Sequence, residues 1–360
     1  MNLFKHLKTL TETPAPSGFE HKIAPVIQDL WEPYVDEFTT DRVGSLIAVK
    51  RGEGKKPRPR ILIAAHMDEI GLMVSEVVEH NGQGFLRVTN LGGVDIRQLY
   101  AQLVTVHGKK DYSGVIGCLP PFMLPEERQN KPYGYEDLVV DLGLPIEKVR
   151  KNISIGNAVS FRQPLRKLEG KRVAGKSLDN RASVAAVSVC LKYLNGRSHD
   201  WDVVAVATAQ EETRLLGAFT ATFSQQPDAA IAIDVTFGKG PGANDERSYE
   251  LGSGPVIEIG PNVHPGMYEN LKKTADNMEM KYNIGFHSRY SGTDAFGVQI
   301  AREGIPTGLI SIPLRYMHTM VESIDTKDVS RSGKLMGEFI AKLDNGFIKK
   351  LSKSMMEKPE

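Results

Sequence analysis

Strand-like and helix-like spacings of apolar residues alternate in the first 70 residues and again after residue 167. Continuous apolar runs of strand length predict strands at 45–50, 60–65, 202–207, 229–234, 282–286 and 308–312. Apolar residues three and four positions apart predict helices at 180–194, 215–223, 268–277, 294–302 and 327–343. This alternation is typical of an α/β fold, so we expect a central mixed sheet with helices on both faces.

The segment between these two parts has a different pattern. Short alternating apolar and polar stretches, separated by Gly, Pro and charged turns, predict strands at 85–89, 103–106, 115–116, 139–142 and 158–161. We therefore expect a small all-β domain at 71–166, inserted into a discontinuous catalytic domain formed by 1–70 and 167–360.

The first helix is expected to follow residue 17. Ser17 and Glu20 have the spacing of a capping box, and apolar residues from Ile23 onward fall on one face. Pro25 has no amide donor, so we expect a kink or a later helix start near it.

Composition and charge narrow the classes of function. A chain of 360 residues with 41% hydrophobic residues can fill two structural units, and a formal charge of +1 gives no basic excess for nucleic acid. Apolar runs are far shorter than the roughly 20 residues that span a bilayer, and the N-terminus lacks a signal-peptide pattern. We expect a cytoplasmic protein with no membrane or nucleic-acid partner. Cys118 and Cys190 lie far apart, which leaves His and carboxylate as metal ligands.

Several predicted strands run directly into residues that commonly bind metals, and a further carboxylate opens a predicted helix. Open α/β sheets place their sites where strands end, so these side chains are expected to meet at one edge. The candidate ligands are His66, Asp179, Glu212, Asp234 and His318.

Each candidate also has an ordinary structural interpretation. A single histidine after a strand is often only hydrogen-bonded, and Asp179 could be a helix-start carboxylate favoured by the helix dipole. Glu211 and Glu212 could be a solvated strand end. Asp234 differs, because a carboxylate that closes an apolar strand is rarely buried unless it is paired or ligated. The shared sheet edge favours a common metal site.

The ligand types point to a particular chemistry. Nitrogen and oxygen ligands suit zinc, cobalt or manganese, and five residues suit two ions that share a bridging carboxylate. Asp68, two residues after His66, can orient that imidazole. Glu211 remains available as the general base for a water molecule whose pKa a metal ion lowers. We therefore expect metal-dependent amide hydrolysis.

The sequence resembles the dinuclear metallo-aminopeptidases of the glutamyl and deblocking type, which form tetrahedral assemblies and include proteins labelled cellulase M. The resemblance covers nearly the whole chain. It rests on the motifs AHMDEIG (65–71), LGG (91–93), SLDNR (177–181), QEE (210–212), ID (233–234), SGTDA (291–295) and RYMHT (315–319).

The resemblance implies residue roles. His66 and Asp234 would bind one ion, Glu212 and His318 the other, and Asp179 would bridge them. Catalytic roles would fall to Glu211 as general base and Asp68 as the residue that orients His66. The fold would be zinc-peptidase-like, with the inserted β segment as a PDZ-like dimerisation domain. Dimers would assemble into a tetrahedral dodecamer that admits peptides.

Two positions depart from the family pattern. Arg214 stands where a glycine is expected, which would narrow or recharge the substrate pocket. Phe122 stands where a histidine often follows two prolines.

Two other functions are alternatives to the peptidase. An endo-acting glycosidase would need opposed carboxyl groups across a sugar and stacking surfaces, and only 7% of the residues are aromatic. A non-catalytic peptide-binding protein would have no use for an intact ligand set and a free Glu211.

Overall fold

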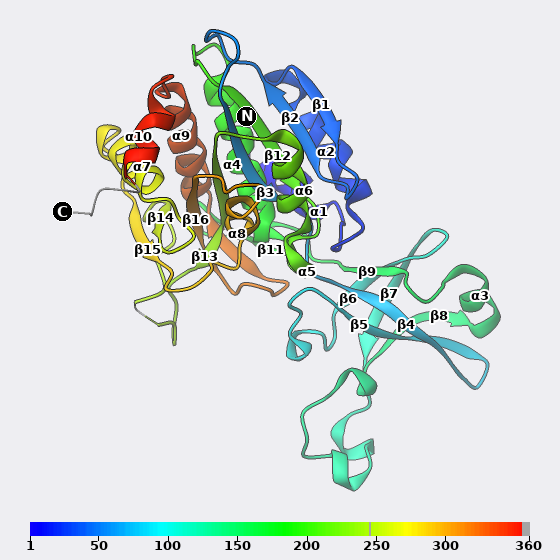
Figure 1. The fold of residues 1–360 in the computed structure, drawn as a ribbon. Coiled ribbons are helices and arrows are strands. Elements are labelled where there is room, and N and C mark those ends of the chain that lie inside the picture. The colour runs from blue at the N-terminus through cyan, green and yellow to red at the C-terminus, as the bar shows by residue number, and fades with distance from the viewer. Residues whose placement is uncertain (245, 355–360) are drawn as a thin grey trace.

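The strands of the molecule form two separate systems. The structure is a computed structural model that describes residues 1–244 and 246–354. Its strands form an 11-stranded sheet and a closed barrel of six strands. Figure 1 shows the barrel beside the larger body that contains the sheet and most of the helices. Within the described ranges, no helix is long and apolar enough to cross a bilayer.

Four parallel strands form the centre of the large sheet. They are β3 (Arg60–His66), β12 (Asp202–Thr208), β13 (Ala229–Phe237) and β16 (Thr307–Arg315). β3 pairs with β12 and β13, and β13 pairs with β16. Ile61 and Ile63 of β3 face one core, whereas Leu62 and Ala64 face another. Burial on both faces explains why these strands have the continuous apolar runs that predict them.

Shorter strands extend the sheet on both sides of this centre and make it mixed, as predicted. They are β1 (Glu37–Thr40), β2 (Leu46–Lys50), β10 (Arg166–Lys167), β11 (Arg172–Gly175), β14 (Val256–Ile259), β15 (Asn283–Phe286) and β17 (Glu322–Asp325). The main path runs β1-β2-β12-β3-β13-β16-β17-β11-β10, and β14 pairs with β16 and β15. Most of these added pairs are antiparallel.

Helices cover both faces of the sheet, which confirms the predicted layers. One face carries α1 (Leu3–Glu12), α2 (Ile23–Trp31), α4 (Leu178–Leu194), α7 (Pro265–Asn277), α9 (Thr326–Ala341) and α10 (Phe347–Ser354). The opposite face carries α6 (Leu216–Gln225) and α8 (Asp294–Gln299). Leu191 and Leu335 share a core with Ile61, whereas Ala218 and Val298 share a core with Leu62.

The barrel has its own hydrophobic core and lies between β3 and β10 in the sequence. Its elements are β4 (Gly71–His80), β5 (Gln83–Leu91), β6 (Leu103–His107), β7 (Asp111–Gly117), β8 (Val139–Pro145), β9 (Ala158–Phe161) and the helix α3 (Ile146–Asn152). Leu72, Leu86, Val104 and Val140 pack together inside it. All five strands predicted for this segment are present. The division of the chain into domains at 71 and 166 stays a prediction.

The start of α2 corrects one local prediction. Ser17 and Glu20 form no capping box: the Ser17 hydroxyl contacts Thr213, and Glu20 Oε1 accepts hydrogen bonds from the backbone N–H groups of Gly18 and Gln210. The helix begins at Ile23, so the expected later start is confirmed. Instead of capping the helix, Ser17 and Glu20 connect this turn to the segment that follows β12.

Several elements were not predicted from the sequence. They are α1, α3, α5 (Glu211–Arg214), α10, β1, β4, β10, β11, β14 and β17. Four of these strands are four residues long, which is too short for a clear alternation. The strand predicted to end at Asp234 continues to Phe237, and the helix predicted at 268–277 begins at Pro265. In that helix the His264 side chain supplies the N-cap.

Candidate metal centre

The predicted ligands lie together near the carboxyl ends of the parallel strands. His66 ends β3 and is paired in register with Thr208 of β12, after which the chain turns into the short helix α5 (Glu211–Arg214). Asp234 lies within β13, and His318 follows β16. The structure therefore brings residues from widely separated positions to one edge of the sheet.

His66 is the centre of one group of ligand atoms. Its Nε2 atom lies 3.2 Å from Asp179 Oδ1, 3.7 Å from Glu211 Oε2 and 3.8 Å from Asp234 Oδ1. The ligand atoms of His66, Glu211 and Asp234 all lie within 4.8 Å of one another. All four side chains are nearly inaccessible to solvent, so these atoms face one another in a confined space.

A second group of ligand atoms forms around Asp179. His318 Nε2 lies 3.5 Å from both Asp179 Oδ2 and Glu212 Oε2. Atoms of His66, Asp179 and Glu212 also lie within 4.8 Å of one another. The two oxygens of Asp179 thus face different histidines, Oδ1 toward His66 and Oδ2 toward His318. Asp179 therefore lies between the two imidazoles.

Negative charge is concentrated in this centre. Burial, and then the Asp179 carboxylate, raises the pKa of Glu212 to about 8. Burial and Asp179 likewise raise the pKa of Asp234 to about 8. The contact with Asp179 raises the pKa of His318 to about 9. Carboxyl groups packed this closely resist ionisation unless cations balance them.

The donor set fits divalent cations. Seven carboxyl groups and two imidazoles gather in the centre, and only His318 among them has a substantially exposed side chain, at 35%. Buried carboxylates are normally paired or bound to metal, and N/O ligands suit zinc, cobalt or manganese. The carboxyl groups belong to Asp68, Asp179, Glu211, Glu212, Asp234, Asp294 and Glu322.

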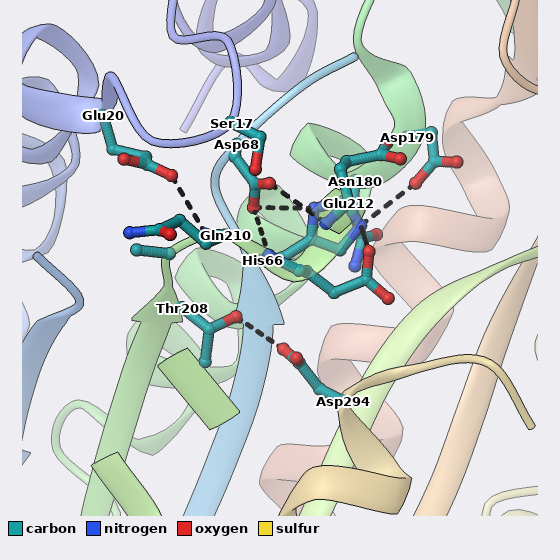
Figure 2. A network of polar contacts seen from close by, with 12 residues as sticks. Ser17, Glu20, His66, Asp68, Asp179, Asn180, Thr208, Gln210, Glu212 and Asp294 are labelled. Carbon is teal, nitrogen blue, oxygen red and sulfur yellow. Dashed lines mark hydrogen bonds and ion pairs between the residues drawn. The ribbon is translucent and has the colours of Figure 1, made fainter. Parts of the chain in front are cut away.

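Asp68 connects His66 to the glutamate pair; Figure 2 shows it between His66 and Glu212. Its side chain is fully buried, and Oδ1 lies 3.4 Å from His66 Nδ1. The carboxylate also accepts hydrogen bonds from the backbone N–H groups of Glu211 and Glu212, each at 3.1 Å. Asp68 therefore contacts the segments that present three of the candidate residues.

The loops that carry the ligands contain left-handed backbone conformations at non-glycine residues. Ser177 precedes Asp179 with φ +59°, Gln210 precedes Glu211 with φ +56°, and His318 itself has φ +60°. Such conformations are sparsely populated and persist where surrounding contacts hold them. The contacts of this centre must therefore fix both the backbone and the side chains.

Two groups at the centre were not identified from the sequence. Glu322 is 1% exposed and accepts hydrogen bonds from the backbone N–H groups of Asp179 and His318, each at 3.0 Å. The Gly93 carbonyl accepts a hydrogen bond from His318 Nδ1 at 3.0 Å. A Cβ atom on Gly93 would come within 2.5 Å of that ring nitrogen. The adjacent glycines of the LGG motif at 91–93 are a sequence signal for such a close approach. Glu322, an acidic residue in a short strand, gives no comparable signal.

Asp294, in the SGTDA motif, was also given no role from the sequence. It is 2% exposed, and Oδ2 accepts a hydrogen bond from the Thr208 hydroxyl at 2.5 Å. Burial raises its pKa to about 6. Figure 2 shows Asp294 below His66, with a dashed line to Thr208, the last residue of β12.

A cavity of about 690 Å³ opens onto the metal centre. Glu211, Glu212 and His318 line one part of it, and exposed Arg214 lines another. Most of the remaining wall is apolar and comes from Leu215, Phe219, Phe237, Tyr290, Phe296 and Met317. The cavity can therefore hold a small polar group at the metal ligands with an apolar side chain beside it.

A comparison with known families identifies the group to which this site belongs. The sequence profile of the M42 glutamyl aminopeptidases matches residues 44–335. The chain belongs to the M42 glutamyl aminopeptidase family. The lysyl aminopeptidase of Pyrococcus furiosus, a relative, is 36% identical over 346 residues, covering 94% of this chain and 96% of the relative. The suspected family resemblance is confirmed.

Solved structures of similar chains agree in fold with this one. A TET aminopeptidase from the marine sediment archaeon Thaumarchaeota archaeon SCGC AB-539-E09 has a TM-score of 0.90, with 28% identity covering 97% of this chain and 98% of the other. The Pyrococcus horikoshii TET1 peptidase, which can assemble into a tetrahedron or a large octahedral shell, has a TM-score of 0.82, with 30% identity and coverage of 95% and 100%. A Thermotoga maritima structure labelled endoglucanase has a TM-score of 0.75, with 28% identity and coverage of 97% and 99%.

Proposed function

We propose that this M42 member is a metal-dependent aminopeptidase that hydrolyses the N-terminal peptide bond of short peptides. The observation that carries the proposal is the convergence of two imidazoles and several buried carboxylates on one cavity, with Asp179 facing both histidines. His66 and Asp234 would hold one ion, Glu212 and His318 a second, and Asp179 both. Zinc and cobalt are the preferred candidates, with manganese as a third.

The two ions, when bound, would act as Lewis acids that polarise the scissile carbonyl and lower the pKa of a water molecule. Glu211 acts as the general base: its side chain lines the cavity and lies 3.7 Å from His66. It takes a proton from the attacking water and then donates it to the leaving amine. Asp68 orients His66 and holds the backbone of the glutamate pair.

The finer details of architecture belong to the same proposal. The catalytic part, 1–70 with 167–360, would be zinc-peptidase-like, and 71–166 would be a PDZ-like dimerisation domain. Dimers would assemble into a dodecamer, as the relatives' tetrahedral assemblies suggest, and the protein would act in the cytoplasm on peptide substrates.

The carboxyl groups of the centre surround two histidines instead of opposing each other across a sugar-sized gap, so the geometry favours a peptidase over a glycosidase.

A pair of substrates tests the proposal. A tripeptide with a free N-terminus should be shortened by one residue after zinc or cobalt is added, and chelation should abolish the reaction. The same tripeptide with an acetylated N-terminus should resist cleavage. Equal cleavage of both peptides would show that no free amine is recognised, and release of sugar from a soluble cellulose would favour the glycosidase.

A further inference from the structure

Glu322 joins two segments that each carry a candidate ligand. It is the first residue of β17 and is 1% exposed. Its Oε1 accepts a hydrogen bond from the backbone N–H of His318, and its Oε2 accepts one from the backbone N–H of Asp179, both at 3.0 Å. One side chain therefore uses both oxygens to connect residues that lie 143 and 4 positions away in the sequence.

The position of Glu322 follows from the order of strands in the sheet. β17 lies between β16 and β11. Glu322 is paired in register with Gly175, the last residue of β11, from which the chain turns toward Asp179. On the other side, Ser323 is paired with Arg315, the last residue of β16, from which the chain turns toward His318. The carboxylate thus occupies the gap between these two turns.

Both turns have irregular backbone conformations. Asp179 and Asn180 have non-helical backbone angles although they lie at the start of α4, and His318 is left-handed with φ +60°. Buried N–H groups in such turns need acceptors. A side chain whose two oxygens accept these N–H groups fixes the backbone of the two residues relative to each other.

We propose that Glu322 is a positioning residue for the second ion, the one assigned to His318 and Glu212 with Asp179. The inference rests on the metal centre under the proposed function. Two of the three ligands of that ion are held by Glu322 through their backbone. Of the ligands assigned to the first ion, only Asp179 is held by Glu322, whose side chain accepts hydrogen bonds from the backbone N–H groups of Asp179 and His318. Loss of Glu322 should therefore weaken mainly the binding of the second ion.

The test is Glu322→Gln, measured by metal binding in the full-length protein. The amide has the same shape as the carboxylate, but its NH₂ group must face one of the two backbone N–H donors. Metal-free protein is titrated with Co²⁺ while visible absorption is recorded, and bound metal is counted after gel filtration. The wild type should take up two ions, and the variant should bind one of them roughly 10- to 100-fold more weakly, with the other nearly unchanged.

His318→Ala identifies which ion is affected. That variant should lose the second ion, and adding Glu322→Gln to it should weaken the binding of the remaining ion by less than the 10- to 100-fold expected for the second ion. Uptake of both ions by Glu322→Gln with wild-type affinity, or an equal weakening of both, would overturn the role of Glu322. A wild type that takes up no ion would overturn the metal centre itself, so the two failures are distinguishable.

Asp328→Asn is the matched control. Asp328 is fully buried on α9, and its two oxygens likewise accept backbone N–H groups, from Gly252 at 2.6 Å and from Gly254 at 2.9 Å. Asp328→Asn alters the same kind of contact, a side chain that accepts two backbone N–H groups, at a place away from the ligands. This variant should still bind both ions. Loss of an ion in Asp328→Asn would attribute the effect to general destabilisation and contradict the proposal. If Glu322→Gln does not fold, Glu322→Asp, whose shorter side chain cannot reach both N–H groups, replaces it with the same expected loss.

Discussion

Asp179 illustrates how the roles of single residues depend on their surroundings. Burial opposes ionisation of its carboxyl group, yet the contacts with His318 and His66 hold its pKa below the usual value. The same burial raises the pKa of Glu212, which has fewer compensating contacts. Asp179 is thus an anionic group between two imidazoles, the state required of a bridging ligand.

Substitutions of Asp179 and Glu211 should separate metal binding from proton transfer. Asp179→Ala removes the residue proposed to bind both ions, so bound metal and activity should fall together. Glu211→Gln keeps an oxygen at the cavity but cannot accept a proton, so both ions should remain while kcat falls by about 100-fold or more. Metal counting and steady-state kinetics on the two variants check this. Substantial activity in Glu211→Gln would refute the assignment of the base.

Gly93→Ala should disturb the centre from the barrel side. The added Cβ would lie 2.5 Å from His318 Nδ1, so the ring must move away from the Gly93 carbonyl that accepts its proton. Affinity for the second ion should fall by about 10-fold or more. Gly117→Ala, also in the barrel, is the control, because a Cβ there meets nothing within 4 Å. Co²⁺ titration of both variants measures the difference, and equal affinities would contradict the predicted clash.

At the scale of elements, the buried parallel strands could be predicted and their connections could not. β3, β12, β13 and β16 have apolar runs because both of their faces are covered, so the sequence carries a strong signal. The four-residue strands β14 and β17 carry almost none. The same limit applies to the metal centre. Candidate ligands at strand ends, such as His66, could be selected from the sequence, but Glu322 makes backbone contacts with two distant turns that no local pattern reveals.

The packing of α1 against α4 predicts a dependence of stability on pH. His6 is 7% exposed, and its Nε2 lies 2.9 Å from the Ser188 hydroxyl, which also accepts a hydrogen bond from Trp31. Burial lowers the pKa of His6 from 6.5 to about 4. Between these values the unfolded chain binds a proton that the folded chain does not. The contribution of His6 to the free energy of unfolding is therefore complete above pH 6.5. It is lost as the pH falls, and the loss reaches about 2 kcal/mol at pH 5.

His6→Gln tests this dependence, since Gln can keep the hydrogen bond to Ser188 but does not titrate. The free energy of unfolding in urea, measured at pH 7.5 and pH 5, should drop less in the variant than in the wild type by about 2 kcal/mol. His21→Gln at an exposed position should behave like the wild type. An identical pH dependence in all three proteins would contradict the prediction.

At the scale of the whole molecule, the excess of buried carboxyl groups connects metal binding to stability. Ions that bind only the folded state stabilise it by about 2.7 kcal/mol each at 100 times their dissociation constant. Chelation should therefore lower the unfolding temperature by several degrees, and zinc or cobalt should restore it. Asp179→Ala should show little response to either treatment. Thermal unfolding followed by circular dichroism measures the effect, and an unchanged midpoint after verified metal removal would contradict it.

The surface of the barrel predicts self-association. Large apolar side chains are exposed there, including Phe122 at 78%, Ile155 at 68% and Met123 at 59%. Apolar surface of this kind marks interaction sites, and the similar Pyrococcus horikoshii TET1 peptidase can assemble into a tetrahedron or a large octahedral shell. Light scattering at micromolar concentration should give a mass near twelve times that of the 39.7 kDa chain. Phe122→Asp, which places a charge on this surface, should shift the protein to smaller species while circular dichroism shows an intact fold. A monomeric wild type would exclude the dodecamer, and an unchanged mass in the variant would place the interface elsewhere.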